Sequence, residues 1–187
     1  MKIAILDDYY QRARDYADWD SASFASIDFI DHHIANENDL VSALQSYDAV
    51  GVMRERTPFP KSLIDALPNL KLIVTSGKQN AAIDVAAAAA KGVTVCGTPS
   101  PGHATAELAF LLVMTLCRKL IPLVNGLKQD HQWQPVMGSD LRGKTLGILG
   151  LGRLGSQVSA LGQAIGMDVV AWSANLDPVA CQQQGVE

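Results

Sequence analysis

The stretch that decides the fold is residues 144–155, which read KTLGILGLGRLG. Residues 145–149 form an apolar run of strand length, and three glycines follow in the pattern G-x-G-x-x-G. A second apolar run occupies residues 168–173. The segment between them has apolar side chains at helical spacing, at Leu154, Val158, Leu161 and Ile165. The order strand, glycine turn, helix, strand predicts a βαβ unit whose helix packs through this apolar stripe.

Each glycine has a separate physical role in such a unit. Gly150 permits the tight turn after the strand, Gly152 lets a phosphate approach the backbone because it has no Cβ, and Gly155 lets the helix pack closely on the strand. The first turn of the helix offers unpaired N–H groups and a partial positive charge. A purely structural glycine turn is the alternative, but the flanking strand and helix favour a dinucleotide site. The residues expected to meet the dinucleotide here are Gly150, Gly152, Arg153, Leu154 and Gly155.

Composition narrows the class of protein. The net charge of -4 and a pI near 5.5 argue against a nucleic-acid-binding surface, which needs clustered Lys and Arg. The three cysteines, Cys96, Cys117 and Cys181, are widely spaced, and we expect the first two to be buried. This pattern favours a reducing cytoplasm, and we expect no metal site. The start MKIAILDDYY turns acidic after six residues, which is not typical of a signal peptide, and no apolar run reaches membrane-spanning length.

Residues 1–98 alternate between strand-like and helix-like segments. We expect strands at residues 2–6, 24–30, 48–54, 70–75 and 93–96. Helices are expected at residues 10–19, 37–45, 60–67 and 85–91, with Asn36 and Asp84 as N-caps. Strands that alternate with helices at this spacing predict a parallel sheet with crossover connections. Residues 1–98 are therefore expected to form a flavodoxin-like, doubly wound domain.

The stretch TPSPGH, residues 98–103, predicts a linker, so the second domain is expected to span residues 99–187. Its first helix, residues 105–117, is apolar enough to be buried on most sides, and a second helix is expected at residues 121–129. Trp133 is expected to pack on the apolar helix or on a partner subunit. The 43 residues from 145 to 187 supply two strands, whereas a full dinucleotide-binding domain has about six. We therefore expect the first part of a Rossmann domain, cut short.

Four blocks of sequence resemble the D-isomer-specific 2-hydroxyacid dehydrogenase family, in its D-3-phosphoglycerate dehydrogenase-like branch. They read IVTSGKQNAAIDVAAAAAKGVTVCGTPSPG, TAELAFLLVMTLCRKL, LRGKTLGILGLGRLG and GMDVVAWSANL. The resemblance implies that the first domain binds substrate and the second binds a nicotinamide cofactor. It also implies a homodimer formed through the TAEL helix and the segment that contains Trp133.

The resemblance implies hydride transfer between a D-2-hydroxy acid and NAD(P). The family's Arg, Glu and His would lie past Glu187, so no catalytic residue is assigned in this chain. The histidines present match none of these blocks and are expected at the surface or in caps; they are His32, His33, His103 and His131.

The loop at residues 76–82 follows the fourth expected strand, at the sheet edge where ligands bind. The matching family loop offers backbone N–H groups to the substrate carboxylate, and here it contains Gly77, Lys78, Gln79 and Asn80. Gln79 stands where many relatives have glycine, while Lys78 and Asn80 offer side-chain donors; a plain turn is the alternative. Arg54 is the better carboxylate ligand of the pair Arg54 and Arg56, which strand alternation would aim alike, and an ion pair with Glu55 is equally open.

The resemblance places Thr105 near the nicotinamide, whereas Glu107 is expected to tie the two domains together. Ser173 occupies the position of the acid that bonds the ribose hydroxyls in NAD enzymes, with Asn175 close behind. Neither Lys nor Arg follows Ser173, so NAD is slightly preferred and NADP stays open.

Three functions compete at this point. The first is an NAD(P)-dependent dehydrogenase, and the second is a non-catalytic dinucleotide-binding or assembly protein derived from that family. A flavodoxin-like response module is the third, because Asp7 and Asp8 end the first expected strand; the glycine turn argues against it.

Overall fold

The structure is a computed structural model that describes residues 1–100 and 102–187. The chain divides into two compact units, Met1–Ser100 and Pro101–Glu187. Pro101, inside the expected TPSPGH linker, lies outside the described residues. Within the described ranges, no helix combines the length and the apolar character needed to cross a bilayer.

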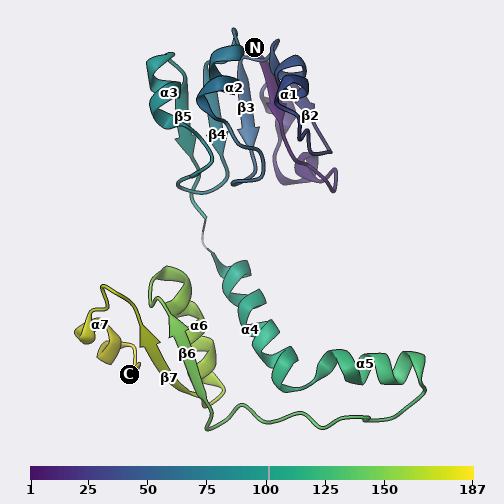
Figure 1. Ribbon diagram of the computed structural model, residues 1–187, viewed down its shortest axis with the longest axis vertical. Helices are drawn as coiled ribbons and strands as arrows, with labels where there is room; N and C mark the ends of the chain where they lie inside the picture. Colours follow the sequence, from purple (N-terminus) through teal and green to yellow (C-terminus); the bar gives the residue numbers. More distant parts are fainter. Residues whose placement is uncertain (101) are drawn as a thin grey trace. The chain divides into compact units, whose positions relative to one another are not determined.

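Unit 1 is built on a five-stranded parallel sheet (Figure 1). The strand order is β2-β1-β3-β4-β5, and each neighbouring pair is parallel. This order is that of flavodoxin-like folds, and it confirms the predicted fold class. The five strands are β1 (Lys2–Ile5), β2 (Ser26–Phe29), β3 (Ala49–Val52), β4 (Leu72–Thr75) and β5 (Thr94–Gly97).

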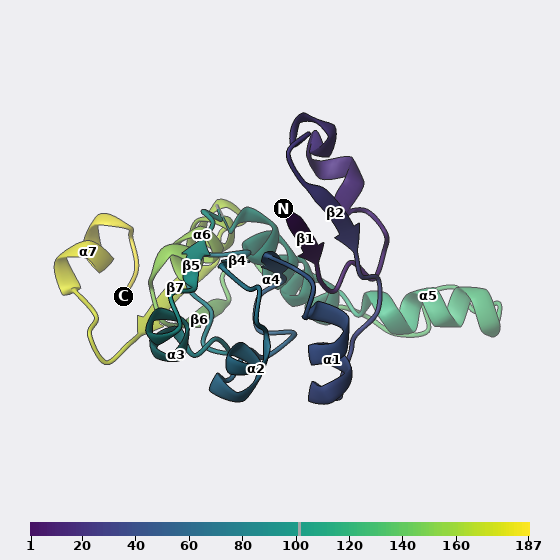
Figure 2. The same cartoon turned by 90° about the horizontal axis from the view of Figure 1, so that it is seen from above.

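Three helices lie along one face of this sheet: α1 (Glu37–Leu44), α2 (Lys61–Ala66) and α3 (Val85–Ala90) (Figure 2). The predicted caps are confirmed, since the side chains of Asn36 and Asp84 accept hydrogen bonds from first-turn N–H groups. In the three central strands β1, β3 and β4, the registered residues Ala4, Val50 and Ile73 are buried on the face that packs with the helices. The main core therefore lies between sheet and helices, and its largest fully buried side chains include Leu44, Val50, Phe59, Leu63, Ile64 and Ile73.

The helix expected at residues 10–19 does not form, and this prediction was wrong. Only two short 3₁₀ turns occur, η1 (Ala13–Tyr16) and η2 (Trp19–Ser21). Gln11 has a left-handed backbone (φ 54°), which an α-helix cannot continue through. The Asp8 carboxylate accepts hydrogen bonds from the N–H groups of Arg12 and Ala13, at 2.9 and 3.1 Å, and so closes a tight turn instead.

Unit 2 begins with two helices, α4 (His103–Cys117) and α5 (Leu120–Gln129). A parallel pair of strands follows, β6 (Thr145–Leu149) and β7 (Asp168–Trp172), with Ile148 opposite Ala171. The connection between them is α6 (Arg153–Ala164), and α7 (Pro178–Gln183) follows β7. Asp177 caps α7 by accepting from the Val179 N–H at 2.9 Å. The order of elements predicted from the glycine-rich stretch is therefore confirmed.

The packing of α6 confirms the predicted apolar stripe in part, because Val158 and Ile165 pack against the hydrophobic core of unit 2. Its buried positions are Ser159 and Gly162, and a Cβ at Gly162 would lie 2.7 Å from Leu146 Cδ2 on β6. Leu154 and Leu161, which belong to the expected apolar stripe, are exposed. Small residues thus let α6 approach β6 closely, because a larger side chain would hold the backbones apart.

Helix α4 was expected to be buried on most sides, and this was wrong for the chain as described. Its buried residues are Ala106 and Phe110, where it packs with α6. Trp133 is 80% exposed and does not pack on α4. Cys96 is exposed and Cys117 half-buried, so the expected burial of both cysteines was also wrong. The remaining faces of α4 and α5 carry exposed large apolar side chains, at Leu108, Leu111, Leu112, Leu116, Leu120, Ile121 and Leu127.

Candidate functional site

The glycine turn of unit 2 has the geometry that a diphosphate site needs. Gly150 is left-handed (φ 95°), which turns the chain sharply off β6. A Cβ built on Gly155 would overlap the carbonyl oxygen of Gly150, so α6 begins in contact with the strand end. A Cβ built on Gly152, the N-cap of α6, meets no atom within 4 Å. The turn is therefore tight on its protein side and open on the side where the helix presents its first N–H groups.

A cavity of 260 Å³ extends from this turn to the end of β7. It brings together Gly150 and Gly152 with Ser173 and Asn175, four of the residues expected at the cofactor. Asp177 lines the same cavity, and sequence analysis missed it because it lies four residues beyond the expected position of the ribose acid. Within the described residues the lining contains no Lys or Arg. Apart from the missing acid at Ser173, the residues present fit a dinucleotide, with room at Gly152 and a carboxylate near the β7 end.

The other expected cofactor residues lie around the start of α6. Arg153 and Leu154 both approach Gly102, because a Cβ there would lie 2.5 Å from Arg153 Nη1 and 2.7 Å from Leu154 Cδ2. Thr105 is exposed in the first turn of α4 and lines none of the described cavities. Glu107 lines a separate cavity of 300 Å³ between α4 and α6. The glycine turn and the end of β7 therefore line one cavity, and Thr105 does not line it.

In unit 1 the structure brings Arg54 together with the loop after β4. Gly77 is left-handed (φ 105°), and its missing Cβ leaves the space that the Arg54 guanidinium occupies. The Arg54 N–H donates to Ser76 Oγ at 3.1 Å, and the Gly77 N–H donates to Thr98 Oγ1 at 3.0 Å. A guanidinium beside a glycine loop is a suitable setting for a carboxylate ligand. The predicted pairing of Arg54 with this loop therefore has a definite geometry.

Asn80 was expected to donate from its side chain to the substrate, but in the structure this side chain makes hydrogen bonds within the protein. It is 8% exposed, and its amide nitrogen donates to the Arg54 carbonyl oxygen at 2.5 Å and to Thr75 Oγ1 at 3.0 Å. Its amide oxygen accepts from the Ala82 N–H at 2.9 Å. With both amide hydrogens used, Asn80 holds the loop against Arg54. Lys78 and Gln79 are exposed and line a cavity of 520 Å³ with Asn80.

Arg54 and Arg56 do not point alike, so the expectation from strand alternation was wrong. Strand β3 ends at Val52, and Arg54 has a left-handed backbone (φ 54°), which breaks the alternation. Arg54 lies over Gly77, whereas Arg56 turns toward the loop after β1. The Arg54 Nε is 3.9 Å from Glu55, so the ion pair considered as an alternative is present at long range. Arg54 therefore belongs to the loop after β4, and Arg56 to the loop after β1.

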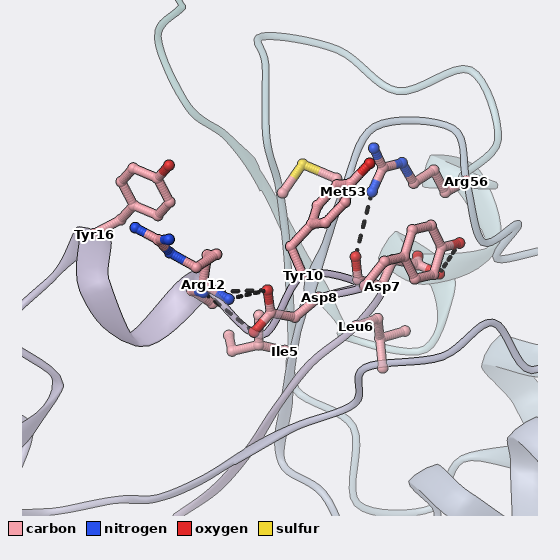
Figure 3. A pocket seen from close by; sticks show the side chains of 11 residues that line it. Ile5, Leu6, Asp7, Asp8, Tyr10, Arg12, Tyr16, Met53 and Arg56 are labelled. Atoms are coloured by element: carbon pink, nitrogen blue, oxygen red, sulfur yellow. Dashed lines mark hydrogen bonds between the residues drawn. The ribbon is translucent and has the colours of Figure 1, made fainter.

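A second group of residues surrounds Arg56 and was missed by sequence analysis. These residues line a crevice of 610 Å³ formed by the loops after β1 and β3. Figure 3 shows its side chains. Arg56 Nη1 donates to the Asp7 carbonyl oxygen at 3.3 Å, and its guanidinium lies 5.0 Å from the centre of the Tyr9 ring. The sequence feature that indicates this crevice is the acidic pair Asp7 and Asp8 directly after the first strand, which is equally typical of a response module.

Asp7 anchors this crevice. Its side chain is 2% exposed, relative to a fully accessible residue, and its backbone is left-handed (φ 60°). The carboxylate accepts from Thr57 Oγ1 at 2.8 Å and from the Tyr9 hydroxyl at 2.9 Å. The hydrogen bond to Asp7 raises the pKa of Tyr9, because it stabilises the protonated phenol. Asp7 is therefore a buried acceptor that fixes the position of Tyr9. The Arg56 guanidinium lies over the face of the Tyr9 ring, so Asp7 also helps to place Arg56.

The comparisons with known proteins agree with this geometry. Residues 110–187 match the family described as "D-isomer specific 2-hydroxyacid dehydrogenase, NAD binding domain". Over 155 residues, 81% of this chain, the sequence is 34% identical to D-3-phosphoglycerate dehydrogenase of Rattus norvegicus and 33% identical to that of Archaeoglobus fulgidus. The matched part is 29% of the length of each of these curated relatives.

Solved structures match over the whole chain. A phosphoglycerate oxidoreductase from Vibrio cholerae O395 is 32% identical, with a TM-score of 0.91 over 100% of this chain and 61% of that one. A putative D-3-phosphoglycerate dehydrogenase from Ralstonia solanacearum is also 32% identical, with a TM-score of 0.88 over 99% of this chain and 58% of that one. A D-lactate dehydrogenase from Aquifex aeolicus "complexed with NAD and Lactic acid" shares the fold, with a TM-score of 0.74 at 24% identity over 99% of this chain and 55% of that one. The chain therefore belongs to the D-isomer-specific 2-hydroxyacid dehydrogenase family.

Proposed function

We propose that this chain carries the substrate-binding part and the start of the NAD-binding part of an oxidoreductase that acts on the CH–OH group of a D-2-hydroxy acid. Residues 1–98 form the substrate side in this proposal, and residues 99–187 form the cofactor side. One observation carries it: a left-handed Gly150, an open Gly152 and a contact-forming Gly155 stand in order at the carboxyl end of a parallel strand. This is the arrangement that receives a dinucleotide diphosphate on backbone N–H groups.

NAD is the cofactor in this proposal, and when bound it supplies the hydride acceptor or donor. Gly150 and Gly152 would meet its diphosphate, with Arg153, Leu154 and Gly155 setting the start of α6, while Ser173 and Asn175 would meet the ribose. The carboxylate of Asp177 in the same cavity, with no Lys or Arg in the described lining, disfavours the extra phosphate of NADP. Thr105 stays a proposed nicotinamide contact on the resemblance alone.

On the substrate side, Arg54 would bind the carboxylate together with the backbone of Gly77, Lys78 and Gln79. The guanidinium already lies over Gly77, whose own N–H donates to Thr98 Oγ1, so in this proposal Gly77 leaves room for the guanidinium while Lys78 and Gln79 supply the backbone donors. Asn80 would position both partners, because its amide ties the Arg54 carbonyl to the loop. A guanidinium with backbone donors stabilises a carboxylate by charge-assisted hydrogen bonds.

We also propose a homodimer formed through α4, α5 and the segment around Trp133, in a cytoplasmic protein. The support is the run of exposed apolar side chains on these helices, including Leu112, Leu116 and Ile121, which a monomer would leave in water. A homodimer interface of this kind buries more than about 1,000 Å² and is mainly apolar. Multi-angle light scattering tests this point, and a stable monomer at micromolar concentration would contradict it.

The proposed function is tested by measuring NADH binding and NADH oxidation on the same sample, with glyoxylate and hydroxypyruvate as oxidants. We expect the chain to bind NADH, because the open Gly152 leaves room for a diphosphate at the start of α6. Absence of NADH binding would contradict the proposal, and turnover of either acid would support the enzyme assignment. The alternative, a non-catalytic dinucleotide-binding or assembly protein, requires NADH binding but no affinity for 2-oxo acids.

A further inference from the structure

The crevice of Figure 3 lies where the strand order of unit 1 changes direction. The chain places β2 on one side of β1 and β3 on the other, so the connections after β1 and β3 leave in opposite directions. In open parallel sheets, ligands bind in the crevice outside the carboxyl ends of the strands at this switch point. The crevice is lined from these two connections and has a volume of 610 Å³.

Charge does not favour an anionic ligand group in this crevice. Arg12 and Arg56 line it together with Asp7 and Asp8, so two positive charges meet two negative ones. Arg12 is already paired with Asp15 at 2.5 Å. A phosphate or a second carboxylate would therefore find no excess of positive charge, although two guanidinium groups are near.

Aromatic and apolar groups make up the rest of the lining. Tyr10 and Tyr16 are 83% and 82% exposed, so a ligand can reach their rings, and Met53 lines the crevice from the loop after β3 (Figure 3). Tyr9 is fixed through its hydrogen bond to Asp7. Rings and a thioether favour a flat apolar group, which stacks on aromatic faces and packs against sulfur. The remaining apolar lining consists of Ile5, Leu6 and Ala13.

Met53 joins the crevice to the proposed carboxylate site. It precedes Arg54 in the sequence and lines the crevice, and its sulfur accepts a hydrogen bond from Ser76 Oγ at 3.2 Å. Ser76 in turn begins the loop that contains Gly77. A substrate whose carboxylate lies at Arg54 and Gly77 would therefore extend its side chain over Met53 into the crevice.

We propose that the substrate is a 2-oxo acid, or the matching D-2-hydroxy acid, with an aromatic side chain, and that Tyr10, Tyr16 and Met53 bind that side chain. This inference rests on the proposed function and names its substrate class. A volume of 610 Å³ greatly exceeds what the methyl group of pyruvate requires, and it lies in the range of sites for larger ligands. The three residues determine specificity in this proposal and take no part in proton transfer.

Isothermal titration calorimetry of the chain with three probes tests the inference: phenylpyruvate, pyruvate and phosphonopyruvate. They share the 2-oxo acid head and differ in carrying an aromatic, a minimal or an anionic tail. We expect phenylpyruvate to bind at least about 10-fold more tightly than either of the others, since it alone buries a ring. Equal affinities, or tightest binding of phosphonopyruvate, would overturn the inference and leave the proposed function standing. If none of the three acids binds, the proposed substrate side fails as well.

Two variants locate the ring. Tyr10→Ala and Tyr16→Ala should each weaken phenylpyruvate binding several-fold and leave pyruvate binding unchanged, because pyruvate does not reach the crevice. Both side chains are exposed, so neither change removes a core residue. Phe24→Ala is the matched control, an exposed aromatic residue that lies outside the crevice lining. If phenylpyruvate binds tightly but neither tyrosine variant weakens it, the ring lies elsewhere and the assignment of the crevice is refuted.

Discussion

Gly155→Ala is the perturbation that most directly tests the packing of the glycine turn. The new Cβ would overlap the Gly150 carbonyl oxygen and would lie 3.1 Å from its carbonyl carbon and 3.2 Å from Ile148 Cγ2. Backbone atoms cannot rotate away, so α6 must move off β6 by roughly 1 Å, and overpacking of this kind costs about 1–3 kcal/mol. For a unit of this size that lowers the midpoint of thermal unfolding by roughly 4–24 °C. The same shift displaces Gly150, so NADH affinity should fall roughly 10- to 100-fold.

Thermal unfolding by circular dichroism and NADH titration by fluorescence measure the two effects on the same samples. Gly147→Ala is the matched control, because a Cβ on this β6 residue meets no atom within 4 Å. Gly162→Ala should give an intermediate loss of stability, since its Cβ meets the flexible end of Leu146. If Gly155→Ala unfolds at the wild-type temperature and binds NADH as wild type does, the close contact between α6 and the turn is refuted.

Three further predictions concern charged groups. Asp177→Ala should improve the affinity for NADPH relative to NADH about 10-fold in fluorescence titrations, because one carboxylate leaves the cavity; an unchanged ratio would contradict this. Arg54→Ala should weaken pyruvate binding roughly 10- to 100-fold by calorimetry, with Arg54→Lys in between, and equal binding in all three would remove Arg54 from the site. The ion pair with Lys71 and the Lys2 backbone N–H lower the pKa of Asp48, so its stabilising effect is present above the unfolded value near 4 and is lost as the pH falls through the lower folded value. Asp48→Asn should accordingly flatten the acid limb of stability measured by urea unfolding, and an unchanged limb would contradict the assignment.

Much of the architecture follows from local sequence. Helices α1 and α3 of unit 1 begin at side-chain caps, and the side chains of Asn36 and Asp84 bind the N–H groups that a cap must satisfy. The G-x-G-x-x-G turn was recognised because three glycines, a strand and a helix occur in a fixed order. Such features depend on residues near one another in sequence, and so they can be predicted from it.

The sequence-based predictions were wrong where a single backbone angle or a tertiary contact determines the local structure. Arg54 and Gln11 adopt left-handed conformations that no period of apolar residues indicates, and each redirects the chain that follows. Helix α6 packs through Ser159 and Gly162 as well as through Val158 and Ile165, because at Gly162 the distance to Leu146 on β6 leaves no room for a larger side chain. The amide of Asn80 is consumed by the Arg54 carbonyl, a contact 26 residues away in sequence. The sequence does not predict that Asp177 lines the cofactor cavity, or that a crevice forms at Asp7, because both depend on how separate loops pack together.

Fluorescence titration with NADH of the wild-type chain and of Gly152→Ala tests the central claim most directly. Gly152 has φ −86° and ψ −162°, a conformation open to alanine, and its Cβ would meet no protein atom within 4 Å. We predict that Gly152→Ala unfolds at the wild-type temperature but binds NADH at least about 10-fold more weakly, because its methyl group occupies the place of the diphosphate. Wild-type affinity in the variant, or no binding by the wild-type chain at millimolar NADH, would contradict the claim that this turn receives a dinucleotide.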